Sequence, residues 1–175
     1  LIYSLSLLFL EHPFNFSVTE IGTLVGIFAL ADKGTGIFWA PSISIPKSKW
    51  YLILGALLAS SSLFTLTLSQ NFYLAFVMMI ILGAGNSLQS LASRLWVSSL
   101  KNADERVFSF SWMHRAINAS AVLISITMFR IHYDQLVIPI FVFMGFLYFL
   151  SGVVVYFLFN PINDEKNIER HEIVE

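Results

Sequence analysis

Asp32 and Lys33 stand side by side in the middle of an apolar stretch, IFALADKGTGIFWAP, which covers residues 27–41. At the centre of a membrane helix each such charge costs roughly 2.5–3.5 kcal/mol, so both need partners or water. A carboxylate in this place can carry a proton, or it can balance a cation on another helix. Adjacent residues of a helix project about 100° apart, so we expect each of the two charges to find a separate partner or water. The alternatives are a structural ion pair, or a lysine whose stem reaches the aqueous interface.

Two further groups of polar residues lie in long apolar runs. Their spacings of three, four or seven residues place each group on one face of a helix. The first group is Asn86, Gln89 and Ser93, and the second is Ser111, Arg115, Asn118 and Ser125. Polar residues inside a membrane normally face the interior of a bundle or a water-filled cavity. We therefore expect the two stripes to share a polar interior with Asp32.

Arg115 has the chemistry to bind an anionic group of a ligand. Its planar fork suits a carboxylate or a phosphate, and it is also a candidate partner for Asp32; a pair that locks two helices is the alternative. His114 could carry protons because its unperturbed pKa is about 6.5, although a hydrogen-bonded packing histidine is the alternative. The side-chain amides could line a cavity or join helices through hydrogen bonds; they are Asn86, Gln89 and Asn118.

Composition restricts the class of protein. Of the 175 residues, 57% are hydrophobic and only 12% are charged, whereas a soluble domain holds about 25% charged residues. The net charge of −1 and the lack of a basic run leave no footprint for nucleic acid. There are no cysteines, and the four histidines are too scattered to suggest a metal cluster. We expect an all-α membrane protein with no metal and no cofactor.

Several apolar runs are long enough to cross a bilayer, because a spanning helix needs about 20 apolar residues. We expect a partial first span at 1–10 and complete spans at about 18–40, 50–68, 72–97, 107–129 and 136–159. They form one helical unit, 1–160, followed at 161–175 by a polar cytoplasmic tail or the start of a central loop. We favour a second span that continues past Asp32 to Pro41 over one that ends at Asp32, because about 14 residues from Val18 are too few for a bilayer of about 30 Å.

The basic residues indicate the orientation of the spans. The loops on one side hold only Arg130, whereas the other side holds Lys47, Lys49, Arg94, Lys101, Arg106, Lys166 and Arg170. By the positive-inside rule the second side is cytoplasmic. Both ends of a six-helix unit are therefore expected in the cytoplasm.

The spans differ in polarity. The third and the sixth contain no Asp, Glu, Lys, Arg or His, so we expect them at the periphery. The second, fourth and fifth carry the polar residues and are expected around the interior. Gly22 and Gly26, four residues apart on the second span, favour close packing against another helix.

The run IILGAGNSLQSLASRLWVSSLKNADERVFSFSWMHRAINASAV, residues 80–122, resembles the fourth helix, cytoplasmic connection and fifth helix of the major facilitator superfamily. The similar features are a Gly-rich run, an acidic-Arg pair at Asp104 to Arg106, and the Phe108-Ser109 that opens the next helix. LADKGTG, residues 30–36, is also similar to the LADRxG core of that family's signature. The resemblance implies half of a fold with twelve helices in two six-helix halves, where the third and sixth helices of each half lie outside a central cavity.

A narrower resemblance concerns the AmpG-like muropeptide-permease branch of that superfamily. FWAP at residues 38–41 and NSLQSLASRLW at residues 86–96 are similar to its segments. Ser90 and Ser93 stand near the places where that branch has acidic residues.

The resemblance implies a secondary active transporter that moves a small solute by alternating access, with H⁺ symport as one coupling mode. This chain would be a six-helix bundle with a truncated first helix, embedded in the lipid bilayer of a bacterial plasma or inner membrane, and it would work with a missing second six-helix half. The expected solute or proton pathway consists of Asp32, Lys33, Asn86, Gln89, His114, Arg115 and Asn118. The alternative functions are a non-transporting multi-pass adaptor or receptor, and a membrane-embedded enzyme; we expect no catalytic residues.

Overall fold

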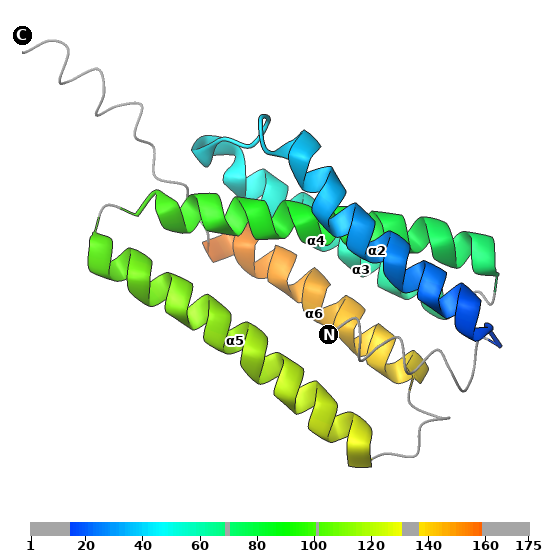
Figure 1. Cartoon of the computed structure of the whole chain (residues 1–175). Coiled ribbons are helices and arrows are strands. Elements are labelled where there is room, and N and C mark those ends of the chain that lie inside the picture. Colours follow the sequence, from blue (N-terminus) through cyan, green and yellow to red (C-terminus); the bar gives the residue numbers. More distant parts are fainter. Residues whose placement is uncertain (1–14, 69–70, 101, 131–136, 159–175) are drawn as a thin grey trace, which may run out of the picture.

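The computed structural model describes residues 15–68, 71–100, 102–130 and 137–158 (Figure 1). Within these ranges the regular structure is helical and no strand occurs, which confirms the expected all-α class. The helices are α2 (Val18–Trp39), the short 3-10 helix η1 (Ile45–Lys47), α3 (Ser48–Leu68), α4 (Phe72–Ser98), α5 (Ala103–Arg130) and α6 (Val137–Leu158). A count of six spans is not established, because the expected partial span at 1–10 and the tail at 161–175 lie outside the described residues.

The α2 helix begins at Val18 because Ser17 and Glu20 form a capping box. Glu20 N donates to Ser17 Oγ at 3.3 Å, and Ser17 N donates to Glu20 Oε2 at 2.7 Å. Asn15, just before the cap, has a positive φ of 54°, a conformation that asparagine adopts more readily than most residues. The helix continues to Trp39, so Asp32 lies well inside it.

Four stretches of the described chain are long and apolar enough to cross a membrane: α2, η1 with α3, α4, and most of α6. The 28-residue α5 is not among them, because His114, Arg115 and Asn118 interrupt its apolar run. It also begins at Ala103, before the expected start near Val107. The cause is a cap: the side-chain oxygen of Asn102 accepts a hydrogen bond from the backbone N–H of Asp104 at 3.0 Å.

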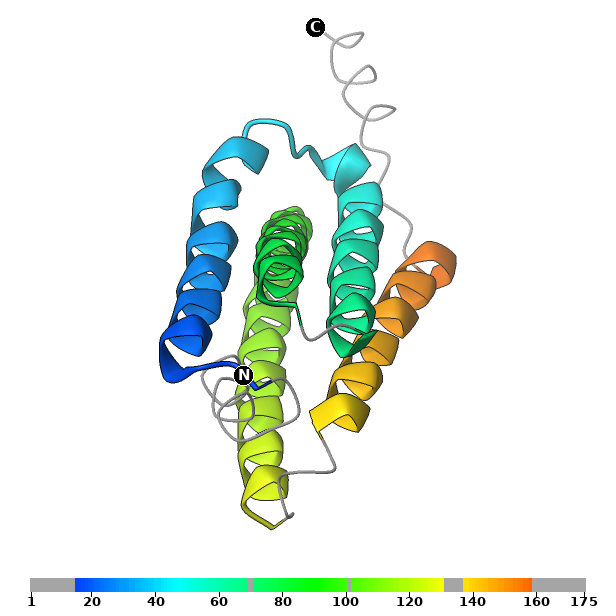
Figure 2. The same ribbon diagram turned by 90° about the vertical axis from the view of Figure 1, so that its right-hand side faces the viewer.

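The α4 helix lies at the centre of the bundle. It packs against α2 and against α3, and α3 packs in turn against α6 (Figure 2). Two glycines bring the backbones of α3 and α4 together. A Cβ on Gly85 would lie 2.8 Å from the carbonyl oxygen of Gly55, and a Cβ on Gly55 would lie 2.7 Å from that of Gly85. The contact between α3 and α4 therefore excludes any side chain at these two positions.

Among the described helices, α3 is packed more closely than the expected peripheral place of the third span suggests. In the most apolar stretch of α3, 44% of the residues are buried, against 17% for α6. The reason is that α3 has small residues toward both neighbours, so that α4 and α6 can each approach it closely. These buried small residues are Gly55, Ala56, Ala59, Ser60 and Ser62.

The expected packing role of Gly22 and Gly26 is not seen among the described residues. A Cβ added to either glycine would meet nothing within 4 Å. The α2 helix uses a different face for its contact with α4, where a Cβ on Gly36 would lie 3.2 Å from Ser87 Oγ. The face with Gly22 and Gly26 is left open by the helices that the structure describes.

Candidate functional site

The carboxylate of Asp32 is the centre of a cluster of polar side chains inside the bundle. Its Oδ1 accepts a hydrogen bond from Asn86 Nδ2 at 2.7 Å. Its Oδ2 forms an ion pair with Lys33 Nζ at 2.6 Å. The Asp32 side chain is only 10% exposed. Both carboxylate oxygens are therefore engaged, one by a neighbouring helix and one by the next residue in the chain.

Gly83 explains why α2 and α4 meet at this point. A Cβ on Gly83 would lie 2.7 Å from the carbonyl oxygen of Phe28 and 2.9 Å from the backbone nitrogen of Asp32. Only a glycine allows the two backbones to approach so closely. Asn86 follows Gly83 by three residues, or about one helical turn, and this turn carries its amide to the Asp32 carboxylate.

Tyr148 links α6 to the same cluster, and sequence reasoning missed it. Its hydroxyl group donates a hydrogen bond to Asn86 Oδ1 at 3.4 Å. The sixth span was expected at the periphery because it contains no Asp, Glu, Lys, Arg or His, and a tyrosine does not change that pattern. The one feature of the sequence that could have indicated this contact is the tyrosine hydroxyl, because a buried tyrosine hydroxyl usually has a hydrogen-bond partner. We call Asp32, Lys33, Asn86 and Tyr148 the Asp32 cluster.

Asp32 has a separate partner in Asn86, as expected, but Asp32 and Lys33 also pair with each other, which was not the favoured expectation. The flexible lysine stem bends back along the helix, so the ammonium reaches the neighbouring carboxylate even though the two Cβ atoms project in different directions. The Lys33 side chain nevertheless remains 85% exposed. The expected pair of Asp32 with Arg115 does not form, and Asp32–Lys33 is the one ion pair within the described residues.

Gln89 belongs to a different contact from the one expected. A Cβ on Gly55 would lie 2.7 Å from Gln89 Cγ, so Gln89 packs on the backbone of α3 and not beside Asp32. Asn86 and Gln89 thus lie on the same half of α4 but contact different helices: Asn86 contacts α2 and Gln89 contacts α3.

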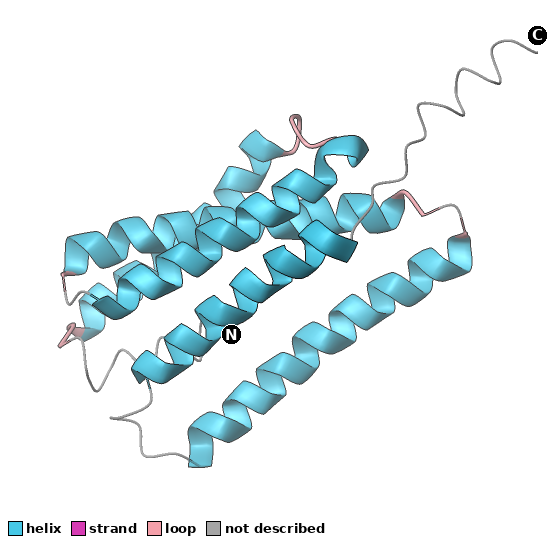
Figure 3. Cartoon of the chain, turned by 180° about the vertical axis from the view of Figure 1, so that it is seen from behind, coloured by secondary structure: helices cyan, strands magenta, loops and turns pink. Residues whose placement is uncertain are grey.

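The polar residues of α5 do not join the Asp32 cluster. His114, Arg115 and Asn118 are all exposed, and α5 makes only sparse contact with α4 at the edge of the bundle (Figure 3). Met113 is half-buried, and Arg115 follows it by two residues, so their side chains project about 200° apart. Of the predicted polar stripe of α5, Arg115 and Asn118 are exposed and Ser111 is half-buried, and Ser125 lies outside the side chains that the structure describes.

The described residues contain no group of three or more His, Cys, Asp or Glu side chains that could hold a metal ion. The chemistry of the Asp32 cluster is therefore that of one carboxylate, one ammonium, one amide and one phenol. These groups can exchange hydrogen bonds, bind a charged or polar solute, and take up a proton at the carboxylate.

Comparison with known proteins places the chain in a family. The model of the Major Facilitator Superfamily matches residues 1–174. No curated protein and no solved structure is detectably similar to the chain. The narrower resemblance to the AmpG-like branch is not supported, since the match is to the superfamily as a whole. Members of this superfamily are transporters of small solutes and not enzymes. The chain therefore belongs to the major facilitator superfamily and is a membrane transporter of that type.

Proposed function

We propose that the chain is one six-helix half of a secondary transporter that moves a small solute by alternating access, and that the Asp32 cluster is part of its solute or proton pathway. The observation that carries this proposal is the place of Asp32. It lies inside a candidate span, its side chain is 10% exposed, and it is bonded to a residue of a second helix. Ionisable groups at membrane depth mark ion and substrate pathways more often than they serve packing alone.

The competing explanation is that Asp32 and Lys33 serve only to hold the helices together. The insertion cost of the two charges exceeds the stability that such a contact would add. A central Asp and a central Lys cost roughly 2.5–3.5 kcal/mol each on an insertion scale. A hydrogen bond between membrane helices stabilises the fold by only about 0.6 kcal/mol on average. An apolar pair at these positions would join α2 to α4 at lower cost, so the charges are better explained by use in transport.

His114, Arg115 and Asn118 complete the proposed pathway from the other flank of α4. Their exposed stripe on α5 would contact the solute, or the second half of the transporter, when the two halves rock around a site near the membrane midplane. The proposed setting is a bacterial plasma or inner membrane with both ends of the six-helix unit in the cytoplasm. The distribution of Lys and Arg between the loops supports this orientation.

Proton symport is the proposed coupling mode, because Asp32 is the acid of α2 that lies inside the membrane. Protonation would remove the charge that holds Lys33 and weaken the bond from Asn86. Binding of a proton would thus loosen the contact between α2 and α4, as coupling requires. The Asp32→Asn variant keeps the hydrogen-bonding shape of the side chain but cannot carry the proton.

The test uses the full-length protein in sealed membrane vesicles with an imposed pH gradient. A mixture of labelled amino acids, sugars, short peptides and carboxylic acids is offered, and accumulated solutes are identified by mass spectrometry. We expect the wild type to accumulate at least one solute and Asp32→Asn to lose uphill accumulation. The matched control is Glu20→Gln, which removes the charge of the acid in the first turn of α2 and keeps a side chain that can form the capping box. Full uphill uptake by Asp32→Asn would refute the coupling role, and loss of folded protein in that variant alone would favour the structural role.

A further inference from the structure

We propose that the ammonium of Lys33 binds an oxyanion group of the transported solute, a carboxylate or a phosphate, so that the solute is an anion or a zwitterion. This inference rests on the proposed transport function and adds the class of substrate to it. It follows from three properties of the cluster: the partners of the Asp32 carboxylate, the exposure of the Lys33 ammonium, and the charge on the neighbouring helix.

Both oxygens of the Asp32 carboxylate already have a partner, and the side chain is only 10% exposed to a cationic solute. One oxygen of Asp32 accepts a hydrogen bond from Asn86 at 2.7 Å, and the other forms an ion pair with Lys33 at 2.6 Å. Tyr148 donates to the carbonyl of the same Asn86 amide and so fixes its orientation, with the amide N–H directed at Asp32. Asn86 and Tyr148 are thus positioning residues that hold the carboxylate within the bundle.

The Lys33 ammonium is accessible to a ligand. Lys33 has three N–H donors, and its side chain is 85% exposed although its Nζ touches Asp32. The residues beside it on α2 are also uncovered: Leu30 is 66% and Ile37 is 75% exposed. One donor is occupied by Asp32, and the remaining donors can receive a ligand that approaches from this face.

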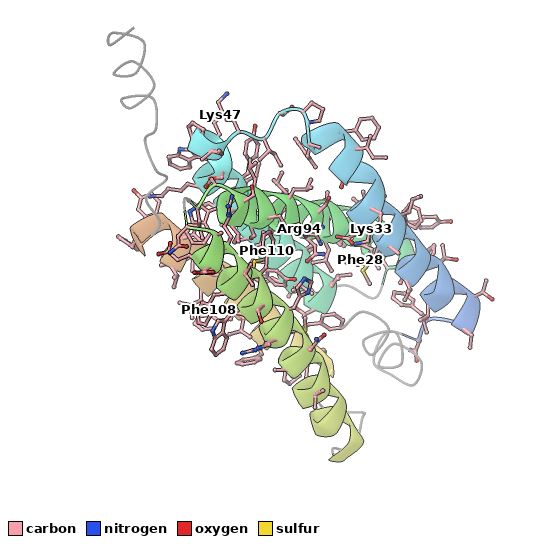
Figure 4. The ribbon with its side chains drawn as sticks, turned by 60° about the vertical axis from the view of Figure 1, so that its left-hand side comes forward. Phe28, Lys33, Lys47, Arg94, Phe108 and Phe110 are labelled. Atoms are coloured by element: carbon pink, nitrogen blue, oxygen red, sulfur yellow. The ribbon has the colours of Figure 1, made fainter. Side chains whose placement is uncertain are left out.

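The neighbouring helix adds positive and not negative charge. Gly83, Ser87 and Leu91 form the face of α4 that meets α2, as their contacts with Asp32 and Gly36 show. Arg94 follows Leu91 by three residues and so lies one turn farther along the same side, where it is exposed. Figure 4 shows Lys33 on α2 and Arg94 on α4.

The charge that this face presents to a ligand is positive. Lys33 is exposed, whereas the Asp32 side chain is 10% exposed and both of its oxygens have partners. An anionic group of a solute would be attracted to the Lys33 ammonium, and a cationic group would be repelled by it. Because a lysine is a compact point charge, its ammonium can bind either a carboxylate or a phosphate.

The test offers matched solutes to vesicles that contain the full-length protein. Each carboxylic acid is paired with its neutral amide, and each sugar phosphate with its free sugar. We expect wild-type uptake of at least one anionic member, in excess of its neutral partner. Lys33→Gln should lower that uptake about tenfold, the effect of one charge-assisted hydrogen bond. Lys33→Arg should restore most of it, and Arg94→Gln should leave it within about twofold because Arg94 does not touch the cluster.

A second measurement does not depend on transport or on a variant that folds. An amine-reactive acylating reagent is applied to the wild-type protein in the same vesicles, and modification of Lys33 is followed by mass spectrometry. We expect the anionic members to slow this modification and the neutral partners to leave it unchanged. Uptake of neutral or cationic solutes that survives Lys33→Gln would overturn the inference but not the proposed transport. No uptake of any solute by the wild type would instead overturn the proposed function itself, and the inference with it.

Discussion

The two flanks of α4 are built in opposite ways. Toward α2 and α3 its contacts are made through backbone at Gly83 and Gly85, and the polar Asn86 beside these glycines is bonded to Asp32. Toward α5 the contact is sparse, and the polar residues of α5 remain exposed. The difference teaches that polar residues within apolar helices have two uses here. On one flank they are satisfied inside the bundle, and on the other they are left available on its surface.

The largest effect should come from filling the glycine contact. Gly85→Ala would place a Cβ 2.8 Å from the carbonyl oxygen of Gly55 and 3.0 Å from the backbone nitrogen of Ala59. Because backbone atoms cannot rotate away, we expect a loss of about 2–3 kcal/mol in the free energy of unfolding. Thermal and denaturant unfolding of the full-length protein in nanodiscs would measure this loss.

Gly22→Ala is the matched control, because a Cβ there meets nothing within 4 Å. Alanine is the better helix former by roughly 0.5–1 kcal/mol, so this variant should be neutral or slightly stabilised. Equal destabilisation of the two variants would show that the contrast between the packed face of α4 and the open face of α2 is false.

A smaller effect is expected from removing the amide that holds Asp32. Asn86→Ala leaves Oδ1 of a mostly buried carboxylate without its donor, at a cost of about 1.5–2 kcal/mol. Asn118→Ala removes the same amide from the exposed stripe of α5 and should change the free energy of unfolding by less than about 0.5 kcal/mol. The same unfolding measurement compares the two. If Asn118→Ala were the more damaging variant, the assignment of satisfied and available polar residues to the two flanks would be reversed.

The smallest effect is expected at the hydroxyl group of Tyr148. Its bond to Asn86 is long, at 3.4 Å, so Tyr148→Phe should lower the free energy of unfolding by about 0.5 kcal/mol. In Tyr156→Phe the exposed ring beside Lys49 is retained, and no change is expected. A double-mutant cycle of Tyr148→Phe with Asn86→Ala measures the coupling between them. Additive losses in that cycle would remove Tyr148 from the Asp32 cluster.

The sequence predicted much of the helical framework and only part of the site. Segment lengths and caps such as Ser17 are local properties, so α2 could be located and Asp32 placed inside it before any packing was known. The partner of Asp32 on α4 was among the candidate residues, but the choice between Asn86 and Arg115 depends on which helices touch. That choice is made by Gly83, whose role appears only when the distance to α2 is known.

Three features of the cluster and its surroundings were beyond sequence reasoning for identifiable reasons. The Asp32–Lys33 pair depends on the rotamer of a flexible stem, which helical projection angles do not describe. The part played by Tyr148 depends on one hydroxyl in an otherwise apolar helix. The burial of α3 depends on small residues such as Gly55 and Ala59, which carry little hydrophobic signal but determine how near two helices can lie.

The adjacency of Asp32 and Lys33 in the chain has a consequence for how the protein is made. An ion pair between helices can form only after both have entered the bilayer, whereas this pair needs no residue outside α2. Its charges can neutralise each other while α2 leaves the translocation machinery, before α4 has been synthesised. The helix can therefore be inserted with the Asp32 carboxylate already paired with Lys33. When α4 is inserted later, Asn86 adds the second partner of that carboxylate.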